Sequence, residues 1–170
     1  KVRFQNIIDG AKKLEIKVPS LNANTNIIFE PSSNLKKVKG KTKTKLFDNI
    51  FVLNFEGMGK FKIYDSFLRS KFINSKIEGD ISFVDNFLFN LKFNINQIKF
   101  RKLLFNYLSN EKDKSFLSSG VSKKINGKSD IFIKSINSFI GRINDLKMQL
   151  IFENGDIRVK NGSALLPQDS

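Results

Sequence analysis

An alternation of apolar and polar residues over residues 81–95, with Val84 and Leu88 as exceptions, constrains the fold most strongly. The odd positions are mostly apolar and read Ile81, Phe83, Asp85, Phe87, Phe89, Leu91, Phe93 and Ile95. The even positions are mostly Ser, Asn and Lys. Because successive side chains of a β-strand point to opposite faces, this pattern predicts strand with one apolar and one polar face. Asp85 and Asn86 interrupt the row, which predicts either two successive strands or one long bent strand.

The same period of two recurs along the chain. The runs that share it are Leu14, Ile16 and Val18; Phe47, Phe51, Leu53 and Phe55, continued by Phe61 and Ile63; and Leu146, Met148, Leu150 and Phe152. Asn154-Gly155 follows the last run, and this dipeptide readily adopts the positive φ angles of a type I′ turn, which predicts a β-hairpin to Ile157 and Val159. We therefore expect a mainly β protein with an antiparallel sheet of long strands.

Residues 98–109 change to a helical period. Their apolar residues fall at i, i+3, i+4, i+7 and i+8: Phe100, Leu103, Leu104, Tyr107 and Leu108. This spacing predicts one short amphipathic helix. Without another break of this kind, residues 1–170 are expected to form a single β-rich region, and the start at Lys1 suggests a fragment of a longer protein.

The composition argues against an enzyme. The chain has no Cys and no His, so catalytic triads that use histidine, disulfides and zinc sites of the Cys/His type are excluded. Gly57-Met58-Gly59 begins like a dinucleotide-binding loop, but Lys62 stands where the third glycine is required. The acidic residues form no evident pair for acid–base catalysis. We expect a protein that is not an enzyme and has no cofactor or metal.

A strong positive charge has several interpretations. The formal net charge is +14, and the densest basic run is Lys36–Lys45. Such a run is typical of a solvated edge strand, where lysines prevent pairing between sheet edges. Binding of anionic headgroups or nucleic acid is the alternative. The run carries no aromatic residue for base stacking, so we favour the edge strand and expect no specific nucleic-acid partner.

Several phrases, in their order along the chain, resemble a known family. They are Phe55–Asp65, Ile77–Asp85, the Leu103–Leu108 helix, Lys124–Ile131 and Leu150–Ile157. This order resembles the C-terminal regions of AsmA-like proteins of the bacterial envelope and covers roughly residues 45–165. The resemblance implies a periplasmic region of an inner-membrane protein, with its membrane anchor outside this chain. It also implies a β-sheet groove with an apolar interior and a role in phospholipid transport between the inner and outer membranes, or in outer-membrane assembly.

The candidate groove residues are the apolar members of the two best alternating runs. They are Phe47, Phe51, Leu53, Phe55, Phe83, Phe87, Phe89, Leu91, Phe93 and Ile95. The expected partners are phospholipid acyl chains, with other envelope proteins as further candidates. A structural or adhesive β domain with a closed core is the alternative, and residue type alone favours it. The two hypotheses differ in whether the protein itself covers the Phe-rich face.

Overall fold

The fold is built from long β-strands. The computed structural model describes residues 1–7, 10–19, 22–31, 37–46, 49–84, 86–102, 125–139 and 141–166. The strands are β1 (Val2–Asn6), β2 (Lys12–Val18), β3 (Ala23–Glu30), β4 (Val38–Leu46), β5 (Asn49–Met58), β6 (Lys60–Arg69), β7 (Ile73–Ser82), β8 (Leu88–Ile98), β9 (Asn126–Ser138), β10 (Gly141–Glu153) and β11 (Asp156–Leu165). The prediction of a mainly β protein is confirmed.

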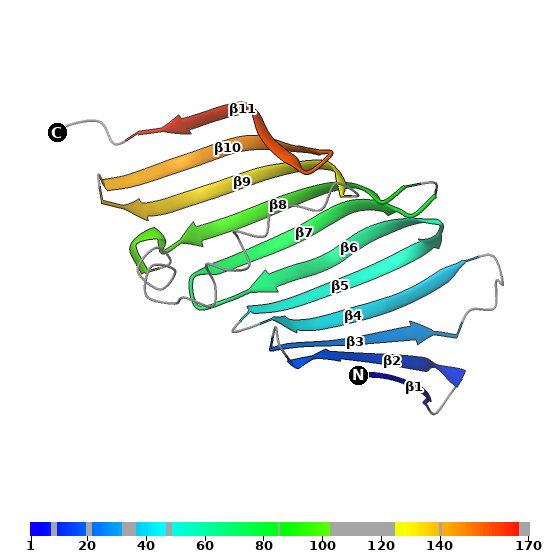
Figure 1. Cartoon of the computed structure of the whole chain (residues 1–170). Coiled ribbons are helices and arrows are strands. Elements are labelled where there is room, and N and C mark those ends of the chain that lie inside the picture. The colour runs from blue at the N-terminus through cyan, green and yellow to red at the C-terminus, as the bar shows by residue number, and fades with distance from the viewer. Residues whose placement is uncertain are drawn as a thin grey trace.

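All of these strands belong to one sheet, and their order in the sheet is their order in the chain. Figure 1 shows them side by side, with the N-terminus at the β1 edge and the C-terminus beside β11 at the opposite edge. Every pairing is antiparallel except that of β8 with β9, which is parallel. A parallel pair needs a crossover of a dozen residues or more, and the chain between Ile98 and Asn126 supplies it. The sheet is open, with β1 and β11 as its edges.

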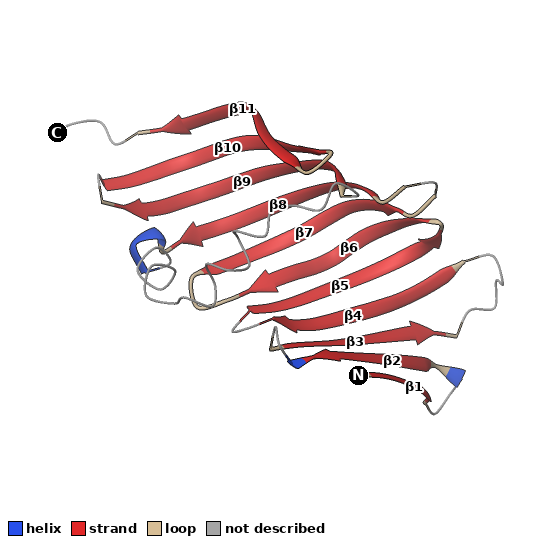
Figure 2. Cartoon of the chain, in the orientation of Figure 1, coloured by secondary structure: helices blue, strands red, loops and turns tan. Residues whose placement is uncertain are grey.

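The helical segment follows β8 directly. Among the described residues it covers 100–102, at the end of the sheet where β8 finishes (Figure 2). The predicted range, 98–109, began too early, because Ile98 is the last residue of β8 and pairs with Ile73 and Ile136. Positions 103–109 lie outside the described residues. No described helix is long and apolar enough to span a bilayer.

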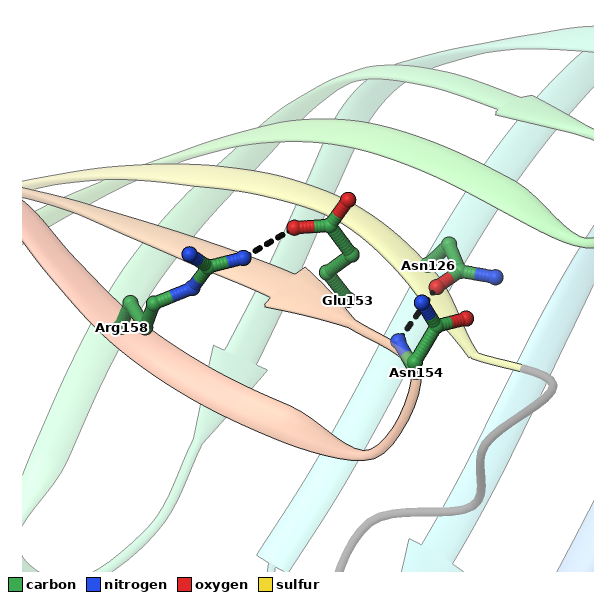
Figure 3. Close-up of polar contacts among 4 residues, drawn as sticks. All are labelled: Asn126, Glu153, Asn154 and Arg158. Atoms are coloured by element: carbon green, nitrogen blue, oxygen red, sulfur yellow. Dashed lines mark hydrogen bonds and ion pairs between the residues drawn. The ribbon is translucent and has the colours of Figure 1, made fainter.

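The Asn154-Gly155 hairpin is confirmed. Asn154 and Gly155 have φ angles of 54° and 93°, and the flanking residues Glu153 and Asp156 pair directly. The backbone N–H of Asn154 donates a hydrogen bond of 2.8 Å to Oδ1 of Asn126, at the start of β9. Arg158 forms an ion pair with Glu153 beside the turn (Figure 3). The hydrogen bond to Asn126 joins the hairpin to β9, and the ion pair lies within the hairpin.

Two sequence expectations about strand boundaries are now resolved. Residues 81–95 form two successive strands, because β7 ends at Ser82 and β8 begins at Leu88. The edge-strand interpretation of the basic run is wrong, because β4 is an interior strand. It pairs with β3 on one side and with β5 on the other, so its lysines do not protect a sheet edge.

A β-bulge in β6 explains why the alternation does not continue beyond Ile63. The register with β7 shifts between Ile63 and Ser66, and Asp65 has a φ angle of 43°. An extra residue in one strand moves the following side chains to the opposite face from the one that simple alternation gives. After the bulge, even-numbered residues of β6 therefore point to the same face as Ile63, beginning with Ser66 and Leu68.

The sheet buries little of its apolar surface. Among the described residues, six hydrophobic side chains are buried: Val52, Ile63, Ile77, Ile95, Ile98 and Ile133. The chain exposes 12115 Å², whereas a compact monomer of its mass would expose about 8,500 Å². Its one buried cluster in the described part joins Ile95, Ile98 and Ile133, with partly buried neighbours such as Phe93 and Leu146. The sheet is therefore a thin structure with a small core near β8–β10.

Candidate functional site

One side of the sheet is apolar from the first strand to the last. Residues paired directly across neighbouring strands point to the same side, so the registers assign each side chain to a face. We call this side the apolar face. Its larger members include Phe4, Leu14, Ile16, Ile27, Phe29, Phe51, Leu53, Phe55, Phe61, Ile63, Leu68, Ile77, Ile81, Phe89, Leu91, Phe93, Ile95, Ile131, Ile133, Leu146, Met148, Leu150, Phe152, Ile157 and Val159.

Most of the candidate groove residues lie on this face. The strand residues among them are Phe51, Leu53, Phe55, Phe89, Leu91, Phe93 and Ile95. Phe83 and Phe87 lie in the connection between β7 and β8 rather than in a strand. Phe47 lies outside the described residues. The registers therefore bring together two runs that are separated in sequence by all of β6 and β7.

Seven phenylalanine rings form a continuous row across the strands. In order of contact they are Phe29, Phe55, Phe61, Phe83, Phe87, Phe89 and Phe152, and neighbouring ring centroids are 5.2–6.2 Å apart. Four of these six contacts are edge-to-face, an arrangement that aromatic quadrupoles favour, and the other two are tilted. Phe83 and Phe87 fill the step between β6 and β8. The row links β3 to β10 through side chains alone.

Glycines on the neighbouring strands make room for rings in this row. Gly40 pairs with Phe55, and a Cβ atom at Gly40 would lie 2.7 Å from Cζ of that ring. Gly127 pairs with Phe89, and a Cβ atom there would lie 2.7 Å from Cδ1 of Phe89. Each ring therefore covers the backbone of the next strand, an arrangement known from sheets in which an aromatic residue covers a glycine.

No described element forms a second layer over the apolar face. The strands pack chiefly against their immediate neighbours in the sheet. Phe4 and Val159 on the two edge strands are 60% and 66% exposed, and Phe83 in the β7–β8 connection is 62% exposed. In the interior of the same face, Ile63, Ile77, Ile95 and Ile133 are at most 9% exposed. A single-layer sheet with one apolar side is incomplete as a packing unit, because such a face is normally buried against another element. The apolar face is therefore a surface that can accept an apolar partner.

The opposite side of the sheet, which we call the basic face, is polar and rich in lysine. On β4 it presents Lys39, Lys41, Lys43 and Lys45, all of them exposed. Lys39 lies 3.0 Å from Glu30, and this hydrogen bond raises the pKa of Lys39. On β2, the hydrogen bond from Lys17 lowers the pKa of Glu15. The two sides of the sheet thus differ sharply in polarity and charge.

The hollows of the described surface are shallow and of mixed polarity. One of about 530 Å³ lies between β8 and β11 and is bordered by Lys92, Phe132, Lys147, Met148 and Asn161. It lies where the β10–β11 register shifts, between Gln149 and Leu150. In the described ranges no group of three acidic side chains gathers closely enough to hold a metal ion.

Comparison of the chain with protein-family models, curated proteins and solved structures found no match. The resemblance to AsmA-like proteins accordingly stays a prediction.

Three members of the aromatic row, Phe29, Phe61 and Phe152, were not among the sequence candidates, although Phe61 continues the alternation of Phe51, Leu53 and Phe55. Phe29 lies in the first 40 residues, outside the alternating run of Leu14, Ile16 and Val18. Ile27 and Phe29 are also two positions apart, and this spacing was the sequence signal that could have placed Phe29 on the apolar side of a strand. Phe152 had been recognised as part of a strand. Its place in the row depends on the register of β9 with β8 and β10, which alternation does not reveal.

Proposed function

We propose that this chain is a lipid-handling protein without catalytic activity, and that its apolar face binds phospholipid acyl chains. The observation that carries the proposal is the apolar face itself, which runs from β1 to β11 with no described second layer. We further propose a role in phospholipid transport between the inner and outer membranes, or in outer-membrane assembly. That part, with the periplasmic location and an inner-membrane anchor outside the chain, rests on the resemblance to AsmA-like proteins.

The dimensions and energetics of the aromatic row suit an acyl chain. From Phe29 on β3 to Phe152 on β10 the row crosses seven strand intervals. At about 4.8 Å per interval its length is about 34 Å, comparable to the hydrocarbon thickness of a bilayer. Burial of about 200 Å² of apolar surface would contribute about 5 kcal/mol, which permits reversible binding. The headgroup would stay in water.

A structural or adhesive β domain with a closed core is the second candidate. The buried cluster of Ile95, Ile98 and Ile133 favours it locally, because these side chains are at most 9% exposed. In this alternative the rest of the apolar face is closed by another apolar surface. The two functions then differ in one measurable property, which is the access of lipid to the face.

Photo-crosslinking in cells tests that property. A photoreactive residue in the full-length protein at Phe87 or Phe93 should capture phospholipid. The matched control is Phe132 on β9, another half-buried phenylalanine, which pairs with Asn94 and Lys147 on the basic face. It should capture none. If neither Phe87 nor Phe93 captures lipid while the protein remains folded, the closed structural domain takes the place of the lipid-binding face. Native mass spectrometry of the full-length protein would identify the lipid.

A further inference from the structure

We infer that the N-terminal part of the basic face, on β2–β5, docks onto the headgroups of an anionic lipid bilayer. This goes beyond the proposed function, because it concerns the side of the sheet opposite the acyl-chain surface. Three lysines of β4 carry the inference: Lys41, Lys43 and Lys45.

Lysines occupy every second position of β4, so their side chains form one row on the same face. Lys39, Lys41, Lys43 and Lys45 all point to the basic face, while Thr42 and its neighbours of the same parity point to the apolar face. Alternate residues of a strand are about 6.6 Å apart, so the four ammonium groups span about 20 Å. All four side chains are exposed.

Three of these cations have no acidic partner. Lys41 pairs with Ile28 and Asn54, Lys43 with Asn26 and Val52, and Lys45 with Asn24 and Ile50. None of these neighbours is charged, and no ion pair joins the three lysines to any described residue.

The carboxylates of β2, β3 and β5 on this face already have partners. Glu15 lies 3.2 Å from Lys17, Glu30 lies 3.0 Å from Lys39, and Glu56 lies 3.8 Å from Lys37. No acidic group of these strands is therefore left to neutralise Lys41, Lys43 and Lys45. Like charges in this arrangement repel one another, and a polyanion relieves that repulsion.

The same face carries a different charge pattern farther along the sheet. Lys92 on β8 lies between Glu78 on β7 and Asp130 on β9, its direct partners in the registers. Lysines and acids thus alternate across β7–β9. The basic face therefore carries more uncompensated positive charge on β4 than on β7–β9.

The shape of the surface favours a bilayer over a nucleic acid. The lysines lie on the side of a sheet, where β2 adds Lys13, with β3 between it and the row on β4. This gives charge spread in two dimensions, as in a plane of headgroups. The basic face of β2–β5 carries no aromatic residue on which bases could stack. Each lysine near an anionic membrane surface strengthens binding roughly fivefold.

Vesicle co-sedimentation with the whole chain tests the inference. Vesicles of phosphatidylcholine are compared with vesicles that also contain phosphatidylglycerol. The chain should partition onto the anionic vesicles and lose that binding as salt is raised. The triple variant Lys41→Gln, Lys43→Gln, Lys45→Gln should bind on the order of a hundredfold more weakly.

The matched control is Lys76→Gln, Lys92→Gln, Lys128→Gln, which removes three charges from the same face of β7–β9. It should weaken binding less than tenfold. An equal loss in both triple variants would mean that net charge alone drives binding and would overturn the inference. Equal binding to both kinds of vesicle would instead assign vesicle binding to the apolar face. If single-stranded DNA displaces the chain from anionic vesicles at a phosphate concentration below that of the lipid, nucleic acid is favoured as the ligand. Circular dichroism of both variants verifies the fold. Lipid capture at Phe93 reports on the proposed function separately.

Discussion

The ring of Phe89 on β8 covers Gly127 on β9, its direct partner across the only parallel pairing among the described strands. A Cβ atom at Gly127 would lie 2.2 Å from the carbonyl oxygen of Phe89 and 2.7 Å from Cδ1 of its ring. The φ angle of Gly127 is 151°, a backbone conformation that other residues rarely adopt. This contact joins the first antiparallel group of strands, β1–β8, to the second, β9–β11.

Gly127→Ala should therefore destabilise the protein, by roughly 1–3 kcal/mol, because backbone or ring must move to admit the methyl group. Urea unfolding measures the effect. Gly162→Ala is the control, since the nearest atom to a Cβ at Gly162 is the carbonyl oxygen of Lys147, 4.0 Å away. That variant should stay within about 0.5 kcal/mol of the parent. Equal stability of the two variants would contradict the close approach at Gly127.

Phe89→Asp distinguishes an open apolar face from a closed core. Phe89 is half-buried and lies in the aromatic row between Phe87 and Phe152. On an open face a carboxylate keeps part of its hydration, so we expect a folded protein that is less stable by roughly 1–3 kcal/mol and does not capture lipid. Phe83→Asp, at a position 62% exposed, should cost less stability. Complete unfolding of the Phe89 variant would indicate a sealed core instead.

The sequence predicts which residues alternate but not which strands are neighbours. The runs over residues 47–63 and 81–95 fall on one face because two intervening registers happen to align them. The bulge at Asp65 changes parity within β6, and no residue pattern marked it. The parallel β8–β9 step and the interior place of β4 likewise depend on long-range pairing. Each strand was therefore easier to predict than the row of rings that crosses them.

The ion pair between Lys17 and Glu15 predicts a specific titration. Because Lys17 donates a hydrogen bond to the carboxylate, the pKa of Glu15 is lowered. A lowered folded-state pKa contributes stability above the unfolded-state value, and this contribution is lost as pH falls through the folded-state value. Lys17→Gln should raise the pKa of Glu15, as measured by NMR titration. Lys13→Gln is the control and should have a smaller effect, since Lys13 acts only through a weaker Coulombic interaction. An unchanged Glu15 pKa in Lys17→Gln would contradict the contact.

Binding of the basic run to DNA should be weak and without sequence preference. Neutralisation of phosphates releases counterions, so affinity should fall steeply as salt concentration rises. The triple variant at Lys41, Lys43 and Lys45 should reduce the slope of log affinity against log salt by about 2 to 3. Fluorescence anisotropy with several unrelated duplexes measures both properties. Sequence-specific binding that persists at high salt would instead favour a nucleic-acid function.

The centre of the aromatic row can be removed without disturbing strand pairing. Phe83 and Phe87 lie in the β7–β8 connection, and their rings bridge Phe61 to Phe89. The double variant Phe83→Ser, Phe87→Ser should therefore remain folded. Its affinity for a fluorescent phospholipid should fall roughly tenfold or more, because the loss of two apolar side chains removes the surface on which an acyl chain would lie.

The matched double variant is Phe67→Ser, Phe132→Ser, which removes two phenylalanines from the basic face. Phe67 pairs there with Val52 and Lys76, and Phe132 with Asn94 and Lys147. Arg69 lies 4.4 Å from the centre of the Phe67 ring, and the Lys147 ammonium lies 5.9 Å from that of Phe132. These rings interact with cations, so their loss should leave phospholipid affinity nearly unchanged. If both double variants lose affinity equally, lipid is not bound along the row of rings. If an acyl chain lies along the row, only the loss of Phe83 and Phe87 should lower the affinity for phospholipid.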